Sequence, residues 1–598
     1  MFTDSTWPVD RWGLAGTPLK DHISFTRRRS KFTGPSERNS SNVSLTQRAN
    51  SAARSVSNAR HHPGAQPRLK IVSASELKPG QSLNFDFSSV RSSDVHVGCL
   101  DNCFFAAAVA SLLTTRPQHF QKVFVATASE LKQGMVKCRF FFDGQWQTVT
   151  IDDFVPVLTT TTTSLVNPDT LHANMNTTTT SHELSSRADH QRKFERTITA
   201  FPFMHCGSRS LDTHQRSITV WPMLLEKAYA KLLGGYDRFG SGGSMAAALL
   251  HLTGLGCHFF DVNTSAAHSR RRKRRHVSFA TLVERIVGCY VDSRPSTIST
   301  GEETASTFSG SISGIVPDHA YAARCMAQTA SATRTVQVTD VRPGAQVIEI
   351  TVQQLQAKFN TFLLRSHLST FVDSEIHDVQ HDDNPCLTEA SKAVMCRTSD
   401  SDVMIGGSNE PALATWTRLL HYTSVSSGVG RRWTFPIQFT EQDGGKVGGS
   451  GWGRGNNVFV VSFGSERQKK APVSVSVWLN VVLLLSDHQQ SVERNGMPSL
   501  EVTLLKVPPD SAGGLFCPPL TLNRFTLQTK STCRRGDPVA FDFCITDTTS
   551  TYVIVPSRRR LRAHTIPCVL SVAAVTNAQA NVNVPVNISR LCWHCISP

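Results

Sequence analysis

The chain has 598 residues, long enough for several domains, but only 39% are hydrophobic, so we expect part of its length to be unstructured. Its 15 cysteines are odd in number and lack the spacing of a disulfide framework, which argues against a small disulfide-stapled secreted protein. No apolar run is long enough to cross a bilayer, and the first 20 residues lack the apolar core of a signal peptide. We therefore predict an intracellular, cytoplasmic protein with free thiols.

The positive charge is concentrated at the beginning of the chain. Residues 1–70 hold twelve Lys or Arg against four Asp or Glu, which supplies +8 of the net +16. This Ser-rich stretch has no helical or alternating periodicity, so we predict a disordered basic extension. Its charge favours anionic partners such as acidic proteins or lipid headgroups, and association with a membrane surface or the cytoskeleton; no specific nucleic acid is indicated. The alternative is a solvated tail without a fixed partner.

Ordered elements begin near residue 69. Good helix formers follow Cys103, and residues 140–153 alternate as a hairpin with Asp143-Gly144 at its turn. A polar stretch at 158–220 with two Thr runs predicts a long loop insertion. Residues 221–233 then predict a helix that ends at two glycines, and a second insertion at 262–278 contains six consecutive basic residues.

The remainder of the chain is rich in strand patterns. Short β-like runs at 286–291, 320–325, 335–338 and 347–351 precede a short helix predicted at 352–362. Beyond Trp416 almost all patterns are strands and turns, which favours a β-sandwich. We thus predict an α+β domain at 71–365, a linker at 366–412, an all-β sandwich domain at 413–575 and a C-terminal tail at 576–598.

One cysteine stands in a setting suited to nucleophilic chemistry. Cys103 follows a Gly-containing loop and opens an apolar helix, where unsatisfied backbone N–H groups and the helix dipole favour a thiolate. Catalysis would also need a histidine from elsewhere in the fold and a third group to orient its ring. Without such partners, a buried structural cysteine is the commoner interpretation.

Four segments occur in an order that carries more information than any one of them. They read Val97-Gly-Cys-Leu-Asp-Asn-Cys103-Phe104, Trp146-Gln-Thr-Val-Thr-Ile-Asp-Asp-Phe-Val-Pro156, Trp221-Pro-Met-Leu-Leu-Glu-Lys-Ala-Tyr-Ala-Lys231 and Gly314-Ile-Val-Pro-Asp-His319-Ala-Tyr321. This series resembles the calpain family of papain-like cysteine proteases, whose matching patterns are Q-G-x-L-G-D-C-W, W-x-x-V-x-I-D-D-x-x-P, W-x-x-L-L-E-K-A-Y-A-K and G-L-V-x-x-H-A-Y. Residues 496–507 and 552–557 resemble the calpain β-sandwich.

The resemblance implies a papain-like, two-subdomain protease core that carries out limited proteolysis of protein substrates. It assigns Cys103 as the nucleophile, His319 as the proton shuttle and Asp340 as the residue that orients His319. Calpains also bind calcium in the protease core, which closes the two subdomains, and Asp94 sits where the family places one ligand. No EF-hand pattern occurs in the sequence.

Two departures from the family pattern concern catalysis. Val97 occupies the position of the Gln whose amide donates to the oxyanion, and loss of one such donor costs about 2.7–4 kcal/mol. His96 is a substitute donor to consider, and Phe104 replaces the usual Trp. These changes leave open an alternative function, that of a calpain-like scaffold or regulator with weak or no hydrolysis.

Asp340 stands where the family has the Asn of R-N-P-W-G, with Arg342 nearby. A carboxylate can hold the imidazole as an amide does and would also stabilise its protonated form. Asp340 could equally be an ordinary turn residue. A second candidate, Asn384, follows the segment that should come after the triad Asn and is therefore out of order.

Overall fold

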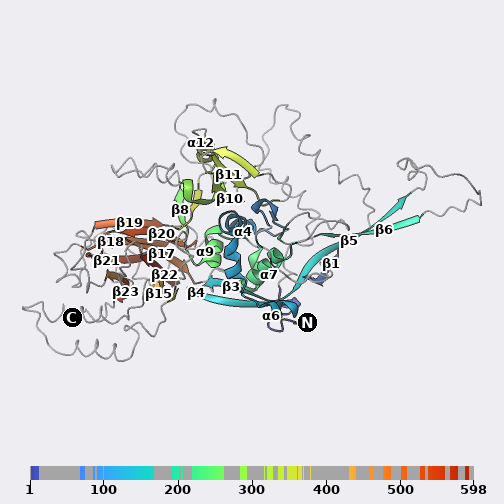
Figure 1. Ribbon diagram of the computed structural model, residues 1–598, viewed down its shortest axis with the longest axis horizontal. Helices are drawn as coiled ribbons and strands as arrows, with labels where there is room; N and C mark the ends of the chain where they lie inside the picture. The colour runs from blue at the N-terminus through green and yellow to red at the C-terminus, as the bar shows by residue number, and fades with distance from the viewer. Residues whose placement is uncertain are drawn as a thin grey trace, which may run out of the picture.

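The structure is a computed structural model. It describes residues 2–12, 68–74, 85, 87, 90–98, 100–166, 192–200, 204–206, 219–240, 242–261, 283–291, 315–316, 319–326, 335–342, 347–359, 361–366, 368, 377–378, 430–439, 458–463, 476–486, 500–507, 526–532, 537–558, 566–576 and 586–591. They form a helical lobe, a sheet lobe beside it and a pair of C-terminal sheets (Figure 1).

The helical lobe, residues 100–256, surrounds one buried helix, α4. Its helices are α4 (Cys103–Thr115), α5 (Phe120–Val123), α6 (Ala128–Lys132), α7 (Trp221–Leu233), α8 (Tyr236–Phe239) and α9 (Met245–Thr253), and its antiparallel hairpin is β3 (Met135–Phe142) and β4 (Gln145–Asp152). Ten consecutive residues of α4, Phe104 to Leu113, are buried, because α9, the sheet lobe and the rings of Tyr229 and Phe239 pack around this helix. The hairpin turn uses Asp143 (φ 49°) and Gly144 (φ 82°), the left-handed pair that a two-residue turn requires, as predicted.

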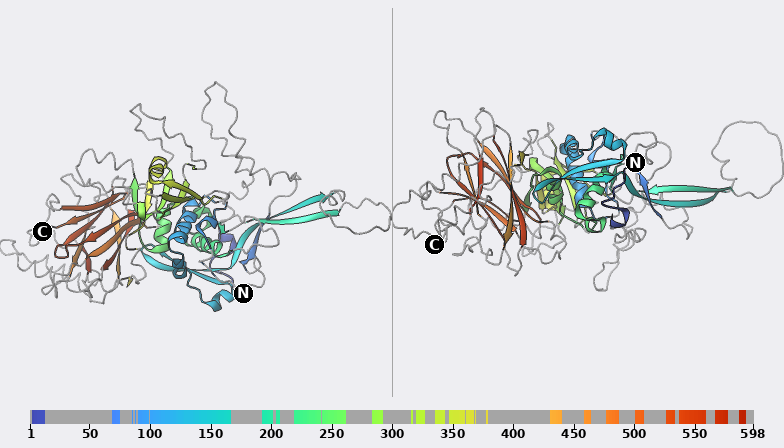
Figure 2. Two further views of the ribbon diagram at one scale, coloured as in Figure 1. Left: turned by 45° about the horizontal axis from the view of Figure 1, so that its top comes forward. Right: turned by 90° about the horizontal axis from the view of Figure 1, so that it is seen from below.

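Two strands extend away from the helical lobe as a long ribbon. Strand β5 (Phe154–Val166) pairs with β6 (Arg192–Ala200), and β1 (Arg68–Ser73) pairs with the base of β5 (Figures 1 and 2). Strand β2 (Val95–His96), which precedes α4 in the chain, pairs with β7 (His205–Cys206). The sequence analysis assigned 158–220 to a loop insertion, but its described parts include these strands. Threonine has high β propensity, and the Thr run at 159–163 was therefore a strand signal.

The sheet lobe, residues 258–364, is a six-stranded antiparallel sheet with the order β12-β11-β10-β9-β13-β8. Its elements are β8 (His258–Asp261), β9 (Ile286–Val291), β10 (His319–Cys325), β11 (Thr335–Thr339), β12 (Val347–Thr351), α12 (Val352–Lys358) and β13 (Thr361–Leu364). Helix α12 begins with a capping box of Thr351 and Gln354. It ends before the predicted boundary at 362, because Phe362 belongs to β13, which pairs with β9 and β8 in the sheet.

The C-terminal part forms two five-stranded sheets around a shared apolar core. One has the order β14-β15-β22-β17-β20 and the other β19-β18-β21-β16-β23. The strands are β14 (His377–Asp378), β15 (Arg431–Phe439), β16 (Val458–Phe463), β17 (Val477–Leu485), β18 (Leu500–Lys506), β19 (Thr526–Thr532), β20 (Val539–Ile545), β21 (Tyr552–Arg558), β22 (Ile566–Thr576) and β23 (Val586–Leu591). Strand β23 pairs with β16, so residues 586–591 of the predicted C-terminal tail at 576–598 belong to one of these sheets.

The C-terminal sheets contact both lobes. On the helical lobe, Thr434 donates to the carbonyl of Gly144 (2.8 Å), and Arg432 donates to the carbonyl of Gly254 (2.8 Å). On the sheet lobe, Arg285 pairs with Asp542 at 2.6 Å. The side chain of Asn480 forms two hydrogen bonds of 3.0 Å with the backbone of Gly256, where the chain crosses from one lobe to the other. Its Oδ1 accepts from the N–H of Gly256, and its Nδ2 donates to the carbonyl.

The first residues of the chain form an N-terminal strap, residues 2–12, on the helical lobe. Trp7 and Trp12 are buried, their rings stack at 5.6 Å, and the ammonium of Lys227 lies 4.1 Å from the centre of the Trp12 ring. Asp4 pairs with Lys231 at 2.6 Å. The predicted disordered extension over 1–70 is therefore wrong for residues 2–12, because tryptophan burial and these charge pairs outweigh the polar composition of the segment.

No helix among the described residues is long and apolar enough to span a membrane. The basic run at 270–275, with the rest of the 262–278 insertion, lies outside the described residues.

Candidate active site

The thiol of Cys103 occupies the first residue of α4, as predicted. Asn102 precedes it as the N-cap residue with no side-chain capping bond, so the first amides of the helix are open toward the thiol side. Phe104 is buried against Phe239, with ring centroids 5.9 Å apart. A free, half-buried thiol at this helix start has the electrostatic setting of a nucleophile.

His319 comes to this thiol from the sheet lobe. It is the first residue of β10, which is paired on both sides and packs beside α4. His319 is only 8% exposed, and its imidazole interacts electrostatically with the thiol of Cys103. Two side chains that are more than two hundred residues apart in the sequence therefore meet between the two lobes.

Asp340 lies directly after β11 and completes this group. Its Oδ1 atom is 2.9 Å from Nε2 of His319. Because Nε2 faces Asp340, Nδ1 is the ring nitrogen available to the thiol. The other carboxylate oxygen, Oδ2, accepts two bonds from the guanidinium of Arg342, at 2.8 and 2.5 Å, and the amide of Arg342 also donates to Oδ1 at 2.9 Å. Arg342 thus fixes the carboxylate in the orientation that His319 requires.

Two opposing effects set the charge of His319. Burial lowers the pKa of His319, but its hydrogen bonds to Asp340 and Cys103 and the charges of both groups raise it, to about 9. Burial raises the pKa of Asp340, while its bonds from His319 and Arg342 outweigh that effect and lower it. An aspartate in the triad position therefore favours the imidazolium form, and an imidazolium beside a thiol favours the thiolate.

The oxyanion side of the site lacks the expected side-chain donor. Val97 is buried, and its backbone N–H donates to the carbonyl of Val341 at 2.8 Å. The ring of His96 lies beside that of His205 on β7, with centroids 5.7 Å apart. The described geometry does not test whether His96 can donate to an oxyanion, so that role stays a prediction.

The buried side chain of Glu226 is hydrogen-bonded to Asn102, the residue that precedes the nucleophile. Glu226 of α7 is fully buried; it accepts a hydrogen bond from the side-chain amide of Asn102 and another, at 2.8 Å, from the backbone N–H of Met204. Burial raises the pKa of Glu226 to about 8, against the effect of these two bonds. The sequence analysis missed this contact. The signal available was an acid in the otherwise apolar first half of α7.

Asp94 does not assemble a recognisable metal site. It ends the short 3-10 helix η5 (Ser92–Asp94), where Oδ2 accepts from the backbone N–H of Arg91 at 3.0 Å and Oδ1 accepts from the hydroxyl of Ser93 at 3.4 Å. Within the described residues, no group of three or more His, Cys, Asp or Glu side chains could hold an ion. The competing triad candidate Asn384 lies outside the described residues.

Comparison with known proteins shows which family this part of the chain matches. A family model described as calpain family cysteine protease matches residues 52–176 and 201–344. This part of the chain is a calpain-family domain. The chain is 29% identical to a calpain of Schistosoma mansoni over 205 residues, which is 34% of this chain and 20% of that protein.

Two further relatives show the same partial coverage. Calpain-13 of Rattus norvegicus is 28% identical over 189 residues, 31% of this chain and 21% of that calpain. A calpain-type cysteine protease DEK1 of Zea mays is 27% identical over 198 residues, 31% of this chain and 7% of its own length. The match therefore spans about a fifth or less of these relatives.

Proposed function

We propose that this calpain-family chain is a cysteine endopeptidase that cleaves protein substrates at few sites. The observation that carries the proposal is the contact of the Cys103 thiol with His319, whose ring Asp340 holds at 2.9 Å. In this proposal the helical and sheet lobes are the two papain-like subdomains, the C-terminal sheets are the calpain β-sandwich, and the protein acts in the cytoplasm.

In the proposed reaction the sulfur of Cys103 attacks the carbonyl carbon of the scissile peptide bond. The thiol proton passes to His319, which then protonates the leaving amine, and the remaining acyl group stays on the sulfur as a thioester. Water attacks the thioester carbonyl while His319 takes its proton, the C–S bond breaks and releases the acyl part as a carboxylic acid, and His319 returns the proton to the sulfur. Asp340 holds the ring orientation throughout, and the backbone N–H of Cys103 donates to the oxyanion.

Labelling with a peptide-based electrophile that alkylates active-site thiols tests the proposal on the full chain. The expected result is stoichiometric labelling that is lost in Cys103→Ala and falls strongly in His319→Ala. Cys544→Ala is the matched control, because Cys544 is also half-buried but lies in β20, away from the site. Labelling that survives in Cys103→Ala would contradict the assignment of the nucleophile.

A second candidate function is a calpain-like scaffold without hydrolysis. Val97 favours it, because the site has lost a donor that is worth about 10² to 10³ in rate. The two candidates differ in turnover: an enzyme cleaves a denatured protein substrate in a Cys103-dependent manner, whereas a scaffold reacts once with the electrophile and cleaves nothing.

Calcium dependence is a separate proposal that rests on the family resemblance alone. The labelling rate is measured with calcium and with a chelator, and Asp94→Asn is compared with Asp101→Asn, an exposed acid of the same loop region. A calcium-dependent rate that only Asp94→Asn removes would support Asp94 as a ligand. Equal rates under both conditions would remove calcium from the mechanism.

A further inference from the structure

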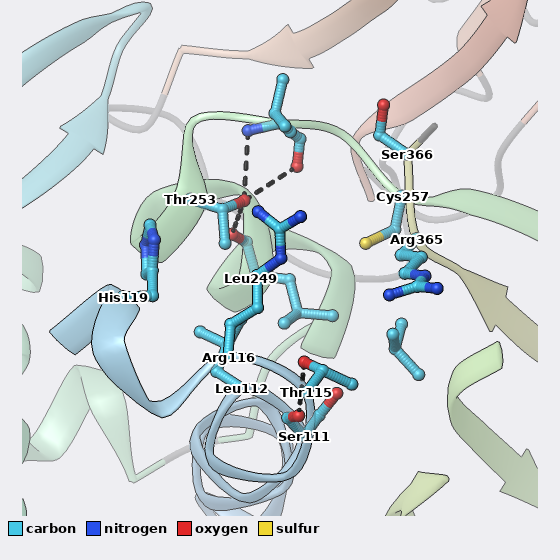
Figure 3. A pocket seen from close by; sticks show the side chains of 12 residues that line it. Ser111, Leu112, Thr115, Arg116, His119, Leu249, Thr253, Cys257, Arg365 and Ser366 are labelled. Carbon is cyan, nitrogen blue, oxygen red and sulfur yellow. Dashed lines mark hydrogen bonds between the residues drawn. The ribbon is translucent and has the colours of Figure 1, made fainter. Parts of the chain in front are cut away.

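Strand β10 begins with His319 and has two different faces. Ala320 and Ala322 belong to the apolar core around α4, and their small side chains leave room for the helix against the sheet. A cavity of about 50 Å³ lies at the end of α4 away from Cys103, and no residue of β10 lines it (Figure 3). On the α4 face, the neighbours of His319 along β10 are thus two alanines.

The opposite face of β10 carries Tyr321, two residues after His319. Side chains two positions apart on a strand point to the same face. The ring of Tyr321 is buried and packs in a T-shaped arrangement with the imidazole, with centroids 4.8 Å apart and planes at 85°. Phe359, the C-cap residue of α12, packs on Tyr321 in the same way at 5.4 Å. The imidazole therefore lies against a ring that belongs to the core of the sheet lobe.

The hydroxyl of Tyr321 binds the chain that leads into β10. It accepts from the backbone N–H of Val316 at 2.8 Å and donates to the carbonyl of Val316 at 3.3 Å. Burial raises the pKa of Tyr321 to about 12, so the phenol keeps its proton at neutral pH. A side chain two positions after His319 thus pairs with both backbone groups of a residue three positions before it.

These contacts matter because sheet pairing is one-sided at the start of β10. His319 lies opposite Val291 of β9, whereas the pairing with β11 begins at Ala322. The imidazole must nevertheless direct one nitrogen to Asp340, at 2.9 Å, and the other to the thiol. A turn of the ring about its bond to Cβ would move both nitrogens away from these partners.

We propose that Tyr321 is a positioning residue for His319. Its ring holds the plane of the imidazole, and its hydroxyl fixes the start of β10, so that the two nitrogens meet Asp340 and Cys103 together. Tyr321 acts through His319 and takes no part in the bond-breaking steps. The inference rests on the role proposed above for the Cys103 and His319 pair, but it does not require hydrolysis.

Alkylation of Cys103 by iodoacetamide, measured on the full chain as a function of pH, tests this role. The small reagent needs no substrate site, and mass spectrometry of the Cys103 peptide separates its rate from those of the other thiols. We expect Tyr321→Leu to lower the rate at pH 7 by about tenfold or more, because a thiol with an ordinary pKa of about 8.5 is only a few per cent thiolate there. The pH of the half-maximal rate should rise toward the same value.

Tyr321→Phe separates the hydroxyl from the ring and is the milder change to the core. It keeps the ring beside His319 and removes both bonds to Val316. We expect the rate to fall by about two- to tenfold, the effect of one lost hydrogen bond on the alignment of the pair. If Tyr321→Leu does not fold, this variant decides the matter, and an unchanged rate and pH profile would overturn the proposal.

Tyr552 supplies the matched controls, because it makes similar contacts in the C-terminal sheets. Its hydroxyl donates at 3.1 Å to the carbonyl of Asp547, also five residues earlier, and its buried ring packs in a T-shaped arrangement with Phe463 at 6.2 Å. Tyr552→Leu and Tyr552→Phe should lower the unfolding midpoint and leave the alkylation profile of Cys103 unchanged. Equal effects of the Tyr321 and Tyr552 variants on that profile would reduce Tyr321 to a structural role.

His319→Ala separates failure of this inference from failure of the proposed function. A profile that changes in His319→Ala but not in folded Tyr321→Leu contradicts the role of Tyr321 alone. A profile that is the same in His319→Ala and the native protein would overturn the Cys103 and His319 pair, and with it the proposed function.

Discussion

The backbone N–H of Val97 donates a 2.8 Å hydrogen bond to the carbonyl of Val341. Val97 follows β2 on the nucleophile side of the site, and Val341 follows Asp340 on the histidine side. The bond therefore joins the two sides of the site through the backbone. It also occupies the backbone donor of Val97, so position 97 offers the oxyanion neither a side-chain nor a main-chain N–H.

Val97→Gln should raise turnover, because it restores an amide at the family's oxyanion position. The expected gain in kcat/KM is up to about 10²-fold, the lower end of what one oxyanion donor contributes. Val97→Met is the control of similar length without an N–H donor, and we expect no gain from it. Equal kinetics for Gln and Met would show that this side chain does not reach the oxyanion.

Asp340→Asn should change how the protein responds to pH. The pKa of His319 is raised from 6.5 to about 9, so its contribution to folding stability is fully present below pH 6.5 and is lost as pH rises through about 9. An amide in place of the carboxylate lowers the pKa of His319 and shrinks this loss. We also expect slower alkylation of Cys103 near neutral pH, because fewer imidazolium groups stabilise the thiolate.

The measurements are the unfolding midpoint and the Cys103 alkylation rate across pH 6–10. Asp101→Asn is the control, since Asp101 is exposed and lies two residues from the thiol. If Asp340→Asn and Asp101→Asn give the same pH profiles, Asp340 does not set the charge of His319.

Trp12→Ala should destabilise the helical lobe by about 3–5 kcal/mol, the usual cost of truncating a buried tryptophan. It also removes the ring beneath the Lys227 ammonium. Urea unfolding and hydrogen exchange of α7 measure the effect. Val9→Ala in the same strap is the control: Val9 is 47% exposed, so we expect a change within about 0.5 kcal/mol. Unchanged exchange of α7 in Trp12→Ala would mean that the strap does not support this helix.

Glu226→Gln should flatten the pH dependence of stability between pH 4.5 and about 8. The pKa of Glu226 is raised from 4.5 to about 8, so the acid's contribution is fully present below pH 4.5 and is lost as pH rises through about 8. Gln does not ionise. The free energy of unfolding of the variant, relative to that of the native protein, should therefore increase steadily between these two pH values. Glu284→Gln, an exposed acid, should show no such gain. If the free energy of unfolding of both variants depended on pH in the same way, the raised pKa of Glu226 would be contradicted.

Alkylation of Cys103 checks whether Glu226 also positions the nucleophile loop. The side-chain amide that Glu226→Gln introduces has one acceptor oxygen, so it cannot accept both bonds that the carboxylate takes from Asn102 and Met204 on its two oxygens. We expect slower alkylation at every pH, in contrast to the pH-dependent change predicted for Asp340→Asn.

Local chemistry made several elements predictable from the sequence. Asp143-Gly144 defines its turn by backbone preference alone, and Gly234 ends α7 in the left-handed conformation that the pattern indicated. Cys103 could be placed at a helix start because the apolar run begins there. The collinear calpain motifs pointed to His319 and Asp340 as its partners, and the structure has His319 interacting with the thiol and Asp340 with the far side of the His319 ring.

The missed features depend on contacts between distant parts of the chain. Trp12 packs on Lys227, more than two hundred residues away, and no local pattern marks a polar, Pro-containing segment as docked. The pairing of β23 with β16 is equally remote in sequence. Glu226 is hydrogen-bonded to Asn102 only because α7 packs against the residues that precede Cys103. The hydrophobic periodicity of the sequence does not predict that contact.

The C-terminal sheets grip the helical lobe through Arg432 and Thr434 and the sheet lobe through the Asp542 pair with Arg285. Because the C-terminal sheets contact both lobes, they connect the two lobes between which the thiol and the imidazole meet. If the two lobes move apart, at least one of these contacts must lengthen or break. A change in the C-terminal sheets can therefore alter the distance between Cys103 and His319 without contacting either residue.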